Sequence, residues 1–208
     1  MNDDRAAFLN RFDVSRETSD KLEVYAELLG RWTERINLVS ASTLPKLWRR
    51  HIWDSAQLLE IAPERWASWA DLGSGAGFPG MVCAIMSSEK HQGAGFTLVE
   101  ADHRKAAFLR TVARETGLIL NIRAERIEET APLNSDILSA RALARLVELL
   151  GYAERHLSSG GRAIYLKGAR AQSEMDAAHH SFRFDCKTYA SETDTEAVIL
   201  SIGDIERV

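Results

Sequence analysis

Hydrophobic residues in the first part of the chain recur at spacings of three and four, the pattern of helices that bury one face. Ser15 is placed to cap the first of these helices. A second helix is predicted after Ser42, with Pro45 in its first turn. We therefore expect residues 1–62 to form a helical extension packed on a second unit, residues 63–208.

Beyond Pro63, short apolar runs alternate with helical patterns, which is typical of a parallel sheet with crossover helices. The predicted strands lie near 67–72, 96–101, 119–124, 136–140, 162–167, 184–190 and 196–202. The predicted helices lie near Pro79 to Ser87, Arg104 to Thr116, Ala144 to Leu157 and Arg170 to His180. Glycines stand where helices should end, at Gly117, Gly160 and Gly161. Residues 191–195 are too short for a helical crossover, so the last two strands should be antiparallel.

Composition agrees with a single globular domain carrying a small appendage. The chain has 208 residues, of which 45% are hydrophobic and 27% are charged. No apolar run approaches the roughly 18 to 20 residues of a membrane helix, and the acidic N-terminus lacks the features of a secretory signal. These features exclude a membrane protein and predict a cytoplasmic one.

The distribution of charge and the cysteine content bear on the possible ligands. The net charge is -4, but eight acids and three bases lie after Arg170, which leaves the preceding part slightly basic and able to face a polyanion. Cys83 and Cys186 are far apart and form no metal-binding pattern. We expect neither a disulfide nor a metal site.

The most informative segment is a strand, a glycine turn and a helix opened by proline, with the sequence WADLGSGAGFPG. Two registers compete. Gly75, Gly77 and Gly80 match the dinucleotide pattern GxGxxG, which would suit a nicotinamide-dependent oxidoreductase. Starting instead at Asp71 gives DxGxGxG with Gly73, Gly75 and Gly77, the order found in enzymes that bind S-adenosylmethionine.

Electrostatics favours the second register. A carboxylate at Asp71 would repel a pyrophosphate but help to hold the ammonium group of a methionine moiety. Glu100 ends the next strand, where a carboxylate can accept hydrogen bonds from ribose hydroxyls. Asp102 is the alternative candidate for this contact. After the third strand, Ile127 and Glu128 are candidate adenine contacts.

Further candidates carry positive charge. Arg141 ends the fourth strand, where it could hydrogen-bond a phosphate or another polar group of a ligand, or form a structural ion pair. Lys167 ends the fifth strand and could bind phosphate. His51 and Asp54 share a helix face and could pair, pinning the N-terminal segment to the rim of the site. Candidates for a surface that faces a polyanion are Arg49, Arg50, Arg104, Lys105 and Arg110.

Taken end to end, the chain resembles the RsmG (GidB) family of bacterial 16S ribosomal RNA guanine-N7 methyltransferases. The resemblance is carried by RINLV at Arg35 to Val39, WRRHIWDS at Trp48 to Ser55, GFPG at Gly77 to Gly80, LVE at Leu98 to Glu100, KAAFL at Lys105 to Leu109, ARA at Ala140 to Ala142 and YLKG at Tyr165 to Gly168. Trp53 and Ala140 depart from the usual residues of these motifs.

The resemblance implies a Rossmann-like class I methyltransferase fold and a cofactor site for S-adenosylmethionine. Gly73 and Phe78 match the family's loop contacts, Ile127 and Glu128 its adenine contacts, and Arg141 its arginine after the fourth strand. We count Arg141, Lys167, His51 and Arg50 as candidates for contact with 16S ribosomal RNA and expect a monomer without metal. Guanine N7 carries no proton, so the reaction needs alignment and not a general base. A non-enzymatic RNA-binding module remains the other alternative.

Overall fold

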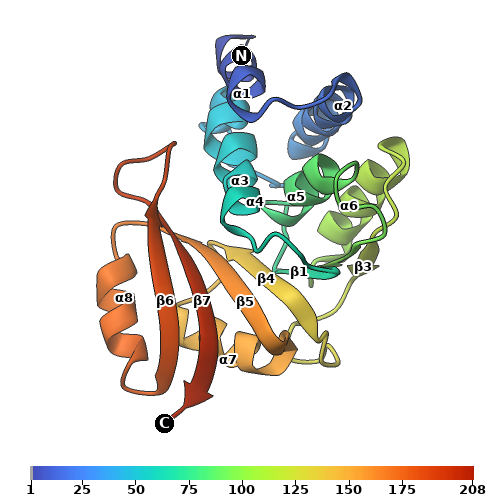
Figure 1. The fold of residues 1–208 in the computed structure, drawn as a ribbon. Coiled ribbons are helices and arrows are strands. Elements are labelled where there is room, and N and C mark those ends of the chain that lie inside the picture. Colours follow the sequence, from blue (N-terminus) through green and yellow to red (C-terminus); the bar gives the residue numbers. More distant parts are fainter. Residues whose placement is uncertain (1) are drawn as a thin grey trace.

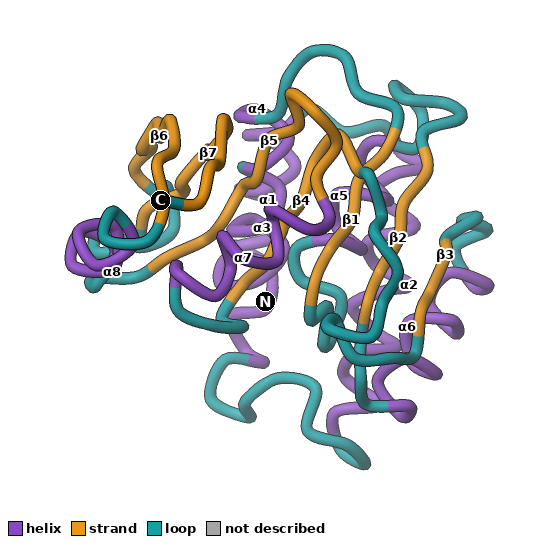
Figure 2. Tube along the Cα trace, turned by 90° about the horizontal axis from the view of Figure 1, so that it is seen from below, coloured by secondary structure: helices purple, strands orange, loops and turns teal. Residues whose placement is uncertain are grey.

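Seven strands form one sheet, in the order β3-β2-β1-β4-β5-β7-β6, in the computed structural model, which describes residues 2–208 (Figures 1 and 2). The strands are β1 Ser68–Leu72, β2 Gly95–Val99, β3 Asn121–Arg123, β4 Ser135–Arg141, β5 Leu157–Lys167, β6 Phe182–Ala190 and β7 Val198–Arg207. The first five are parallel, whereas β7 pairs antiparallel with both β5 and β6. The predicted α/β class and the antiparallel last pair are confirmed.

Helices cover both faces of this sheet. They are α1 Asn2–Phe12, α2 Arg16–Thr33, α3 Asp54–Ala56, α4 Leu58–Ile61, α5 Gly80–Ser87, α6 His103–Glu115, α7 Leu146–His156 and α8 Ala171–Ala178. Helices α7 and α8 lie on one face, and α5 and α6 lie on the other together with the N-terminal helices (Figure 1). Ser15 caps α2 as predicted, because its side chain accepts a hydrogen bond from the Thr18 backbone.

Three local expectations need correction. Helix α1 is missing from the prediction because its hydrophobic pattern is weak. The segment after Ser42 is a helical run of mixed type, with a 3-10 turn at Leu44–Lys46 and a π-helix at Trp48–Trp53 ahead of α3 and α4. Gly160 and Gly161 lie inside β5 instead of in a turn, because α7 ends at His156.

Strand β1 divides the core by its alternating side chains. Ala70 and Leu72 point toward α7, whereas Trp69 is fully buried on the other face, in a cluster with Cys83 of α5. Asp71 alternates onto the same face as Trp69 and is also fully buried. A buried carboxylate near the end of β1 therefore lies directly under helix α5.

The N-terminal helices contribute to the core of the sheet domain. Phe8 of α1 and Leu22 of α2 belong to the same buried cluster as Met81 of α5 and Phe108 of α6. Within the described residues, none of the helices is long and apolar enough to cross a membrane.

The strand order reverses between the neighbouring strands β1 and β4. In sheets of this kind, ligands bind in the crevice at the carboxyl ends of the two strands where the order reverses.

Candidate active site

The glycine loop after β1 has backbone angles that favour glycine. Gly73, Gly75 and Gly77 have φ values of +62°, +56° and +98°, in the left-handed region. A Cβ on Gly73 would lie 2.5 Å from the Leu143 side chain, and one on Gly77 would lie 2.7 Å from Met81. At Gly75 only the Gly73 carbonyl is close, at 3.8 Å. The loop is thus packed at both ends and open at Gly75.

Asp71 lies beneath this loop instead of lining it. Its side chain has no exposed surface, and Oδ1 accepts a 2.6 Å hydrogen bond from Ser139 of β4. Helix α5 begins so close to it that a Cβ on Gly80 would lie 2.5 Å from the Asp71 Cβ. Burial raises the pKa of Asp71 to about 6. The other oxygen, Oδ2, is buried and has no hydrogen-bond partner among the described residues, and the predicted contact of Asp71 with an ammonium group stays a prediction.

Glu100 directly follows β2, and its carboxylate holds the glycine loop, while its predicted contact with a ribose stays a prediction. Its Oε2 accepts a 2.7 Å hydrogen bond from the Gly75 backbone, and Oε1 accepts one of 2.8 Å from Asp102. The Glu100 side chain remains at the edge of the crevice, with 8% of the residue exposed. Asp102 has a different task, because its carboxylate caps α6 at Arg104.

The predicted adenine segment is held by helix α7. Ile127 is buried in the cluster between this helix and the sheet. Tyr152 of α7 donates a 2.7 Å hydrogen bond to Glu128, and Arg155 bonds to the Thr130 carbonyl. The segment that follows β3 is therefore fixed beside the crevice.

The N-terminal extension reaches the glycine loop through Tyr25 of α2. The Tyr25 hydroxyl donates a 2.6 Å hydrogen bond to the Ala76 carbonyl, and its ring packs on Phe78. Burial raises the pKa of Tyr25, so the phenol stays protonated and acts as a donor. This contact joins residues that are 51 positions apart.

Arg141, at the end of β4, is the centre of a polar cluster. Its Nη1 donates to the Arg50 carbonyl at 3.1 Å and to Asp54 Oδ2 at 3.4 Å, and its Nη2 donates to His51 Nδ1 at 2.7 Å. The guanidinium carbon lies 4.9 Å from the centre of the Phe78 ring. These bonds use three of the five N–H donors of a guanidinium, which leaves two without a hydrogen-bond partner among the described residues. The ion pair considered from the sequence is present, with Asp54 as the partner.

The tautomer of His51 follows from its partners. Because a guanidinium only donates, Nδ1 must accept, and the proton on Nε2 points to Thr43 Oγ1 at 2.9 Å. Burial and the nearby Arg141 lower the pKa of His51 to about 3, so the ring is neutral. The ring also stacks on Phe78, 4.9 Å between centres.

His51 and Asp54 do not bond to each other as the sequence suggested, since each turns toward Arg141. The second oxygen of Asp54 accepts hydrogen bonds from the loop between β6 and β7, from Thr193 at 2.7 Å and from Ser191 at 3.4 Å. Arg50 pairs with Asp194 of the same loop at 2.8 Å. The N-terminal segment is pinned to the rim of the site, but through Arg141 and this loop.

A cavity of about 910 Å³ opens beside the cluster, over the carboxyl ends of β4 and β5. Lys167 lines it but is only 9% exposed, because Nζ pairs with Glu174 at 2.6 Å and donates to the Ala144 carbonyl. The cavity also contains two exposed cations that the sequence prediction missed, Arg145 and Arg170. No pattern in the sequence distinguishes these two residues, because each is a single arginine at the start of a helix.

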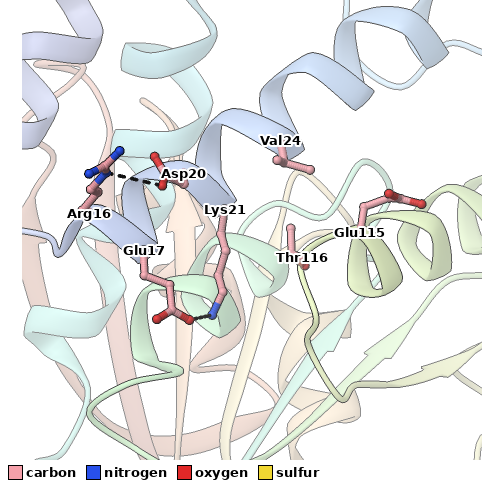
Figure 3. Close-up of a pocket in the computed structure, with 7 residues that line it drawn as sticks. All are labelled: Arg16, Glu17, Asp20, Lys21, Val24, Glu115 and Thr116. Carbon is pink, nitrogen blue, oxygen red and sulfur yellow. Dashed lines mark ion pairs between the residues drawn. The ribbon is translucent and has the colours of Figure 1, made fainter.

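The other basic candidates are spread over the surface. Arg49 lies over the Trp53 ring, Arg104 pairs with Asp102, and Arg110 donates to the Ile122 carbonyl. A separate cavity of about 560 Å³ lies between α2 and α6 (Figure 3). It is lined mostly by charged side chains, including the Lys21–Glu17 pair at 2.7 Å, and contains none of the predicted site residues.

Known proteins resemble this chain along most of its length. The family model described as "rRNA small subunit methyltransferase G" matches residues 18–197. A ribosomal RNA small subunit methyltransferase G from Ruegeria sp. (strain TM1040) is 49% identical over 196 residues, which cover 94% of this chain and 95% of the relative. One from Cereibacter sphaeroides (strain ATCC 17025 / ATH 2.4.3) is 44% identical over 208 residues and the full length of both chains.

Two solved structures illustrate the fold. A TehB-like SAM-dependent methyltransferase from Corynebacterium glutamicum has a TM-score of 0.57 and 17% identity, covering 78% of this chain and 94% of its own. A ribosomal protein L11 methylase from Lactobacillus delbrueckii subsp. bulgaricus has a TM-score of 0.55 and 18% identity, covering 72% and 75%. The sheet is that of class I S-adenosylmethionine-dependent methyltransferases.

Proposed function

Because the chain belongs to the rRNA small subunit methyltransferase G family, we propose that it transfers a methyl group from S-adenosylmethionine to N7 of a guanine in 16S ribosomal RNA. The observation that carries the proposal is the meeting of two groups at one crevice. The glycine loop closed by Glu100 lies at the end of β1, and the Arg141 cluster lies at the end of the neighbouring β4.

The residues at the crevice fit S-adenosylmethionine. The loop at Gly75 is open, and the Glu100 carboxylate is within reach of the loop backbone, where it can exchange an N–H donor for ribose hydroxyls. Ile127 and Glu128 would border the adenine, and Gly73 and Phe78 would border the remainder of the cofactor. The cofactor supplies a methyl group on a positively charged sulfonium.

The reaction at N7 needs no proton transfer. The in-plane lone pair of N7 forms the new C–N bond as the methyl–sulfur bond breaks, and the positive charge passes from sulfur to the purine. No general base is required, so the chain contributes alignment and binding. The two free donors of Arg141 suit guanine O6 or a phosphate oxygen, and His51, Asp54 and Phe78 hold the guanidinium in place.

The neutral state of His51 supports this division of roles. A neutral ring accepts from Arg141, whereas a charged ring would repel it. His51 and Asp54 therefore act as positioning residues for Arg141 in this proposal, and Arg141 is the residue that contacts substrate. We extend the proposal to a monomeric, cytoplasmic enzyme with residues 1–62 as a helical extension and 63–208 as the methyltransferase domain.

The test is transfer of labelled methyl groups to RNA. The protein would be incubated with labelled S-adenosylmethionine and unmethylated 16S rRNA or small subunits, and the label would be mapped by mass spectrometry. We expect label at N7 of one guanine. RNA binding without label would favour a non-enzymatic module, and an NADH fluorescence change without S-adenosylmethionine binding would favour an oxidoreductase.

A further inference from the structure

Five cations line the large cavity beside Arg141, and three of them already have carboxylate partners. The paired cations are Arg50 with Asp194, Arg141 with Asp54 and Lys167 with Glu174. Arg145 and Arg170 form no ion pair or side-chain hydrogen bond with any residue that the structure describes, and both are exposed. Their guanidinium groups are therefore free to bind an anion.

The two arginines stand where the cavity continues into a neighbouring groove. Both also line a groove of about 450 Å³ between α7 and α8. Arg141 lines the large cavity but not the groove. An RNA chain with its reacting base at Arg141 that leaves the site along this groove would thus pass Arg145 and Arg170.

Local helix stability does not explain these two residues. Arg145 is the N-cap residue of α7 and Arg170 that of α8, and neither side chain makes a capping hydrogen bond. N-cap positions favour Ser, Thr, Asp or Asn, and a cation is disfavoured near the positive end of a helix. Positions at which a sequence opposes the local rule are expected at functional sites.

We propose that Arg145 and Arg170 bind backbone phosphates of the RNA next to the target nucleotide. Arginine suits this task because its planar fork can donate two parallel hydrogen bonds to one phosphate. Two glutamates also line the cavity, Glu148 and Glu174, and Lys167 balances the charge of Glu174. This inference rests on the proposed function. It assigns two residues of this chain to the RNA backbone, the part of the substrate that carries no sequence information.

The experiment compares Arg145→Ser, Arg170→Gln and a control, Arg183→Gln. Arg183 is exposed near the start of β6, at the end of the sheet opposite the cavity. Its substitution by glutamine changes the net charge by the same amount as each cavity substitution. Binding of a 16S rRNA transcript would be measured over a range of salt concentrations. S-adenosylmethionine affinity, methyl-transfer kinetics and thermal stability would be measured on the same proteins.

Arg145→Ser separates binding from folding. With Glu148 three residues on, serine at this position completes a capping box, so the melting temperature should stay equal or rise. RNA affinity should fall about three- to tenfold, and the slope of log affinity against log salt should fall by about 0.7 to 0.9 for each phosphate that is no longer neutralised. S-adenosylmethionine affinity should not change. Arg145→Lys should retain most of the salt slope.

Each outcome of this experiment supports or contradicts the proposed phosphate contacts. RNA affinity and salt slope that fall in both cavity variants but not in Arg183→Gln support the phosphate contacts. Slopes equal to that of the control would overturn them, and so would a lower melting temperature in Arg145→Ser, which would make the arginine structural. Wild-type protein that transfers no label would contradict the proposed function instead, whatever the variants bind.

Discussion

At the scale of single residues, Glu100 holds the glycine loop and, in the proposed complex, also binds the ribose. It accepts hydrogen bonds from Gly75 and Asp102, and in the proposed complex it accepts from the ribose. Glu100→Ala should weaken S-adenosylmethionine binding tenfold or more, because each hydrogen bond to a charged acceptor contributes about 1.5 to 3 kcal/mol. Calorimetry measures this, and unchanged affinity would remove Glu100 from the ribose site.

Arg141 should affect turnover more than cofactor binding. Arg141→Ala removes the group that orients the guanine, and a misplacement of about 1 Å can lower the rate a hundredfold. The glycine loop and Glu100 remain, so much of the cofactor affinity should survive. Arg141→Lys should restore little activity, because an ammonium cannot replace the planar fork that bonds to His51 and Asp54. Full activity in Arg141→Lys would contradict the orienting role, and unfolding of Arg141→Ala on circular dichroism would make the ion pair structural.

Asp71 predicts a pH-dependent stability. Its pKa is raised by burial from 3.8 to about 6, so the folded state keeps a proton that the unfolded state loses. Stability should therefore fall as pH rises from about 4 to about 6 and stay lower above that. At about 1.36 kcal/mol per pKa unit, the loss is on the order of 3 kcal/mol.

Asp71→Asn should remove this dependence. Urea denaturation at each pH measures the free energy of unfolding of both proteins. The stability of the variant relative to that of the wild type should rise between pH 4 and pH 7. Comparison at two pH values cancels any constant cost of the amide. A difference that does not vary with pH would show that Asp71 is ionised without penalty.

At the scale of elements, helix α2 holds the glycine loop through one hydroxyl. Tyr25→Phe removes the hydrogen bond to Ala76 while keeping the packing on Phe78. We expect a loss of about 1 kcal/mol of stability and weaker S-adenosylmethionine binding, because the loop is less restrained.

Tyr165→Phe is the matched control for this substitution. Tyr165 is equally buried and donates a 2.9 Å hydrogen bond to the Leu149 carbonyl in α7, away from the glycine loop. Both variants should lose similar stability in denaturation, but only Tyr25→Phe should lose cofactor affinity by calorimetry. Equal cofactor affinity in the two variants would reduce Tyr25 to a packing residue.

At the scale of the whole molecule, the position of the site restricts the substrate. The cavity of about 910 Å³ lies at the end of the sheet and is lined by residues of the helical extension, of the segments that follow β4 and β5, and of the loop between β6 and β7. N7 faces the deep, narrow major groove of A-form RNA, so the target guanine must lie in a loop or be otherwise accessible. Structured 16S rRNA or a small subunit should be methylated more efficiently than a short oligonucleotide. Equal kcat/KM for any guanine in unstructured RNA would argue against this selection.

The amino-acid sequence by itself determined most of the fold and the place of the site. Alternating apolar strands and amphipathic helices predict the parallel sheet, and the glycines of the loop after β1 mark backbone that other residues adopt at a cost. Glu100 and Arg141 are candidates because the carboxyl ends of parallel strands meet at one edge of the sheet. Each of these signals depends on local periodicity, on backbone geometry or on a strand end, which neighbouring residues encode.

Only the tertiary structure decided which atoms meet. Asp71 turns under α5 because strand alternation places it on that face, and Gly80 allows the helix to approach. Asp54 bonds to Thr193, 139 positions away, instead of to His51. Such partners follow from how distant elements pack, because a hydrogen bond depends on distance and direction in space and leaves no periodic pattern along the chain.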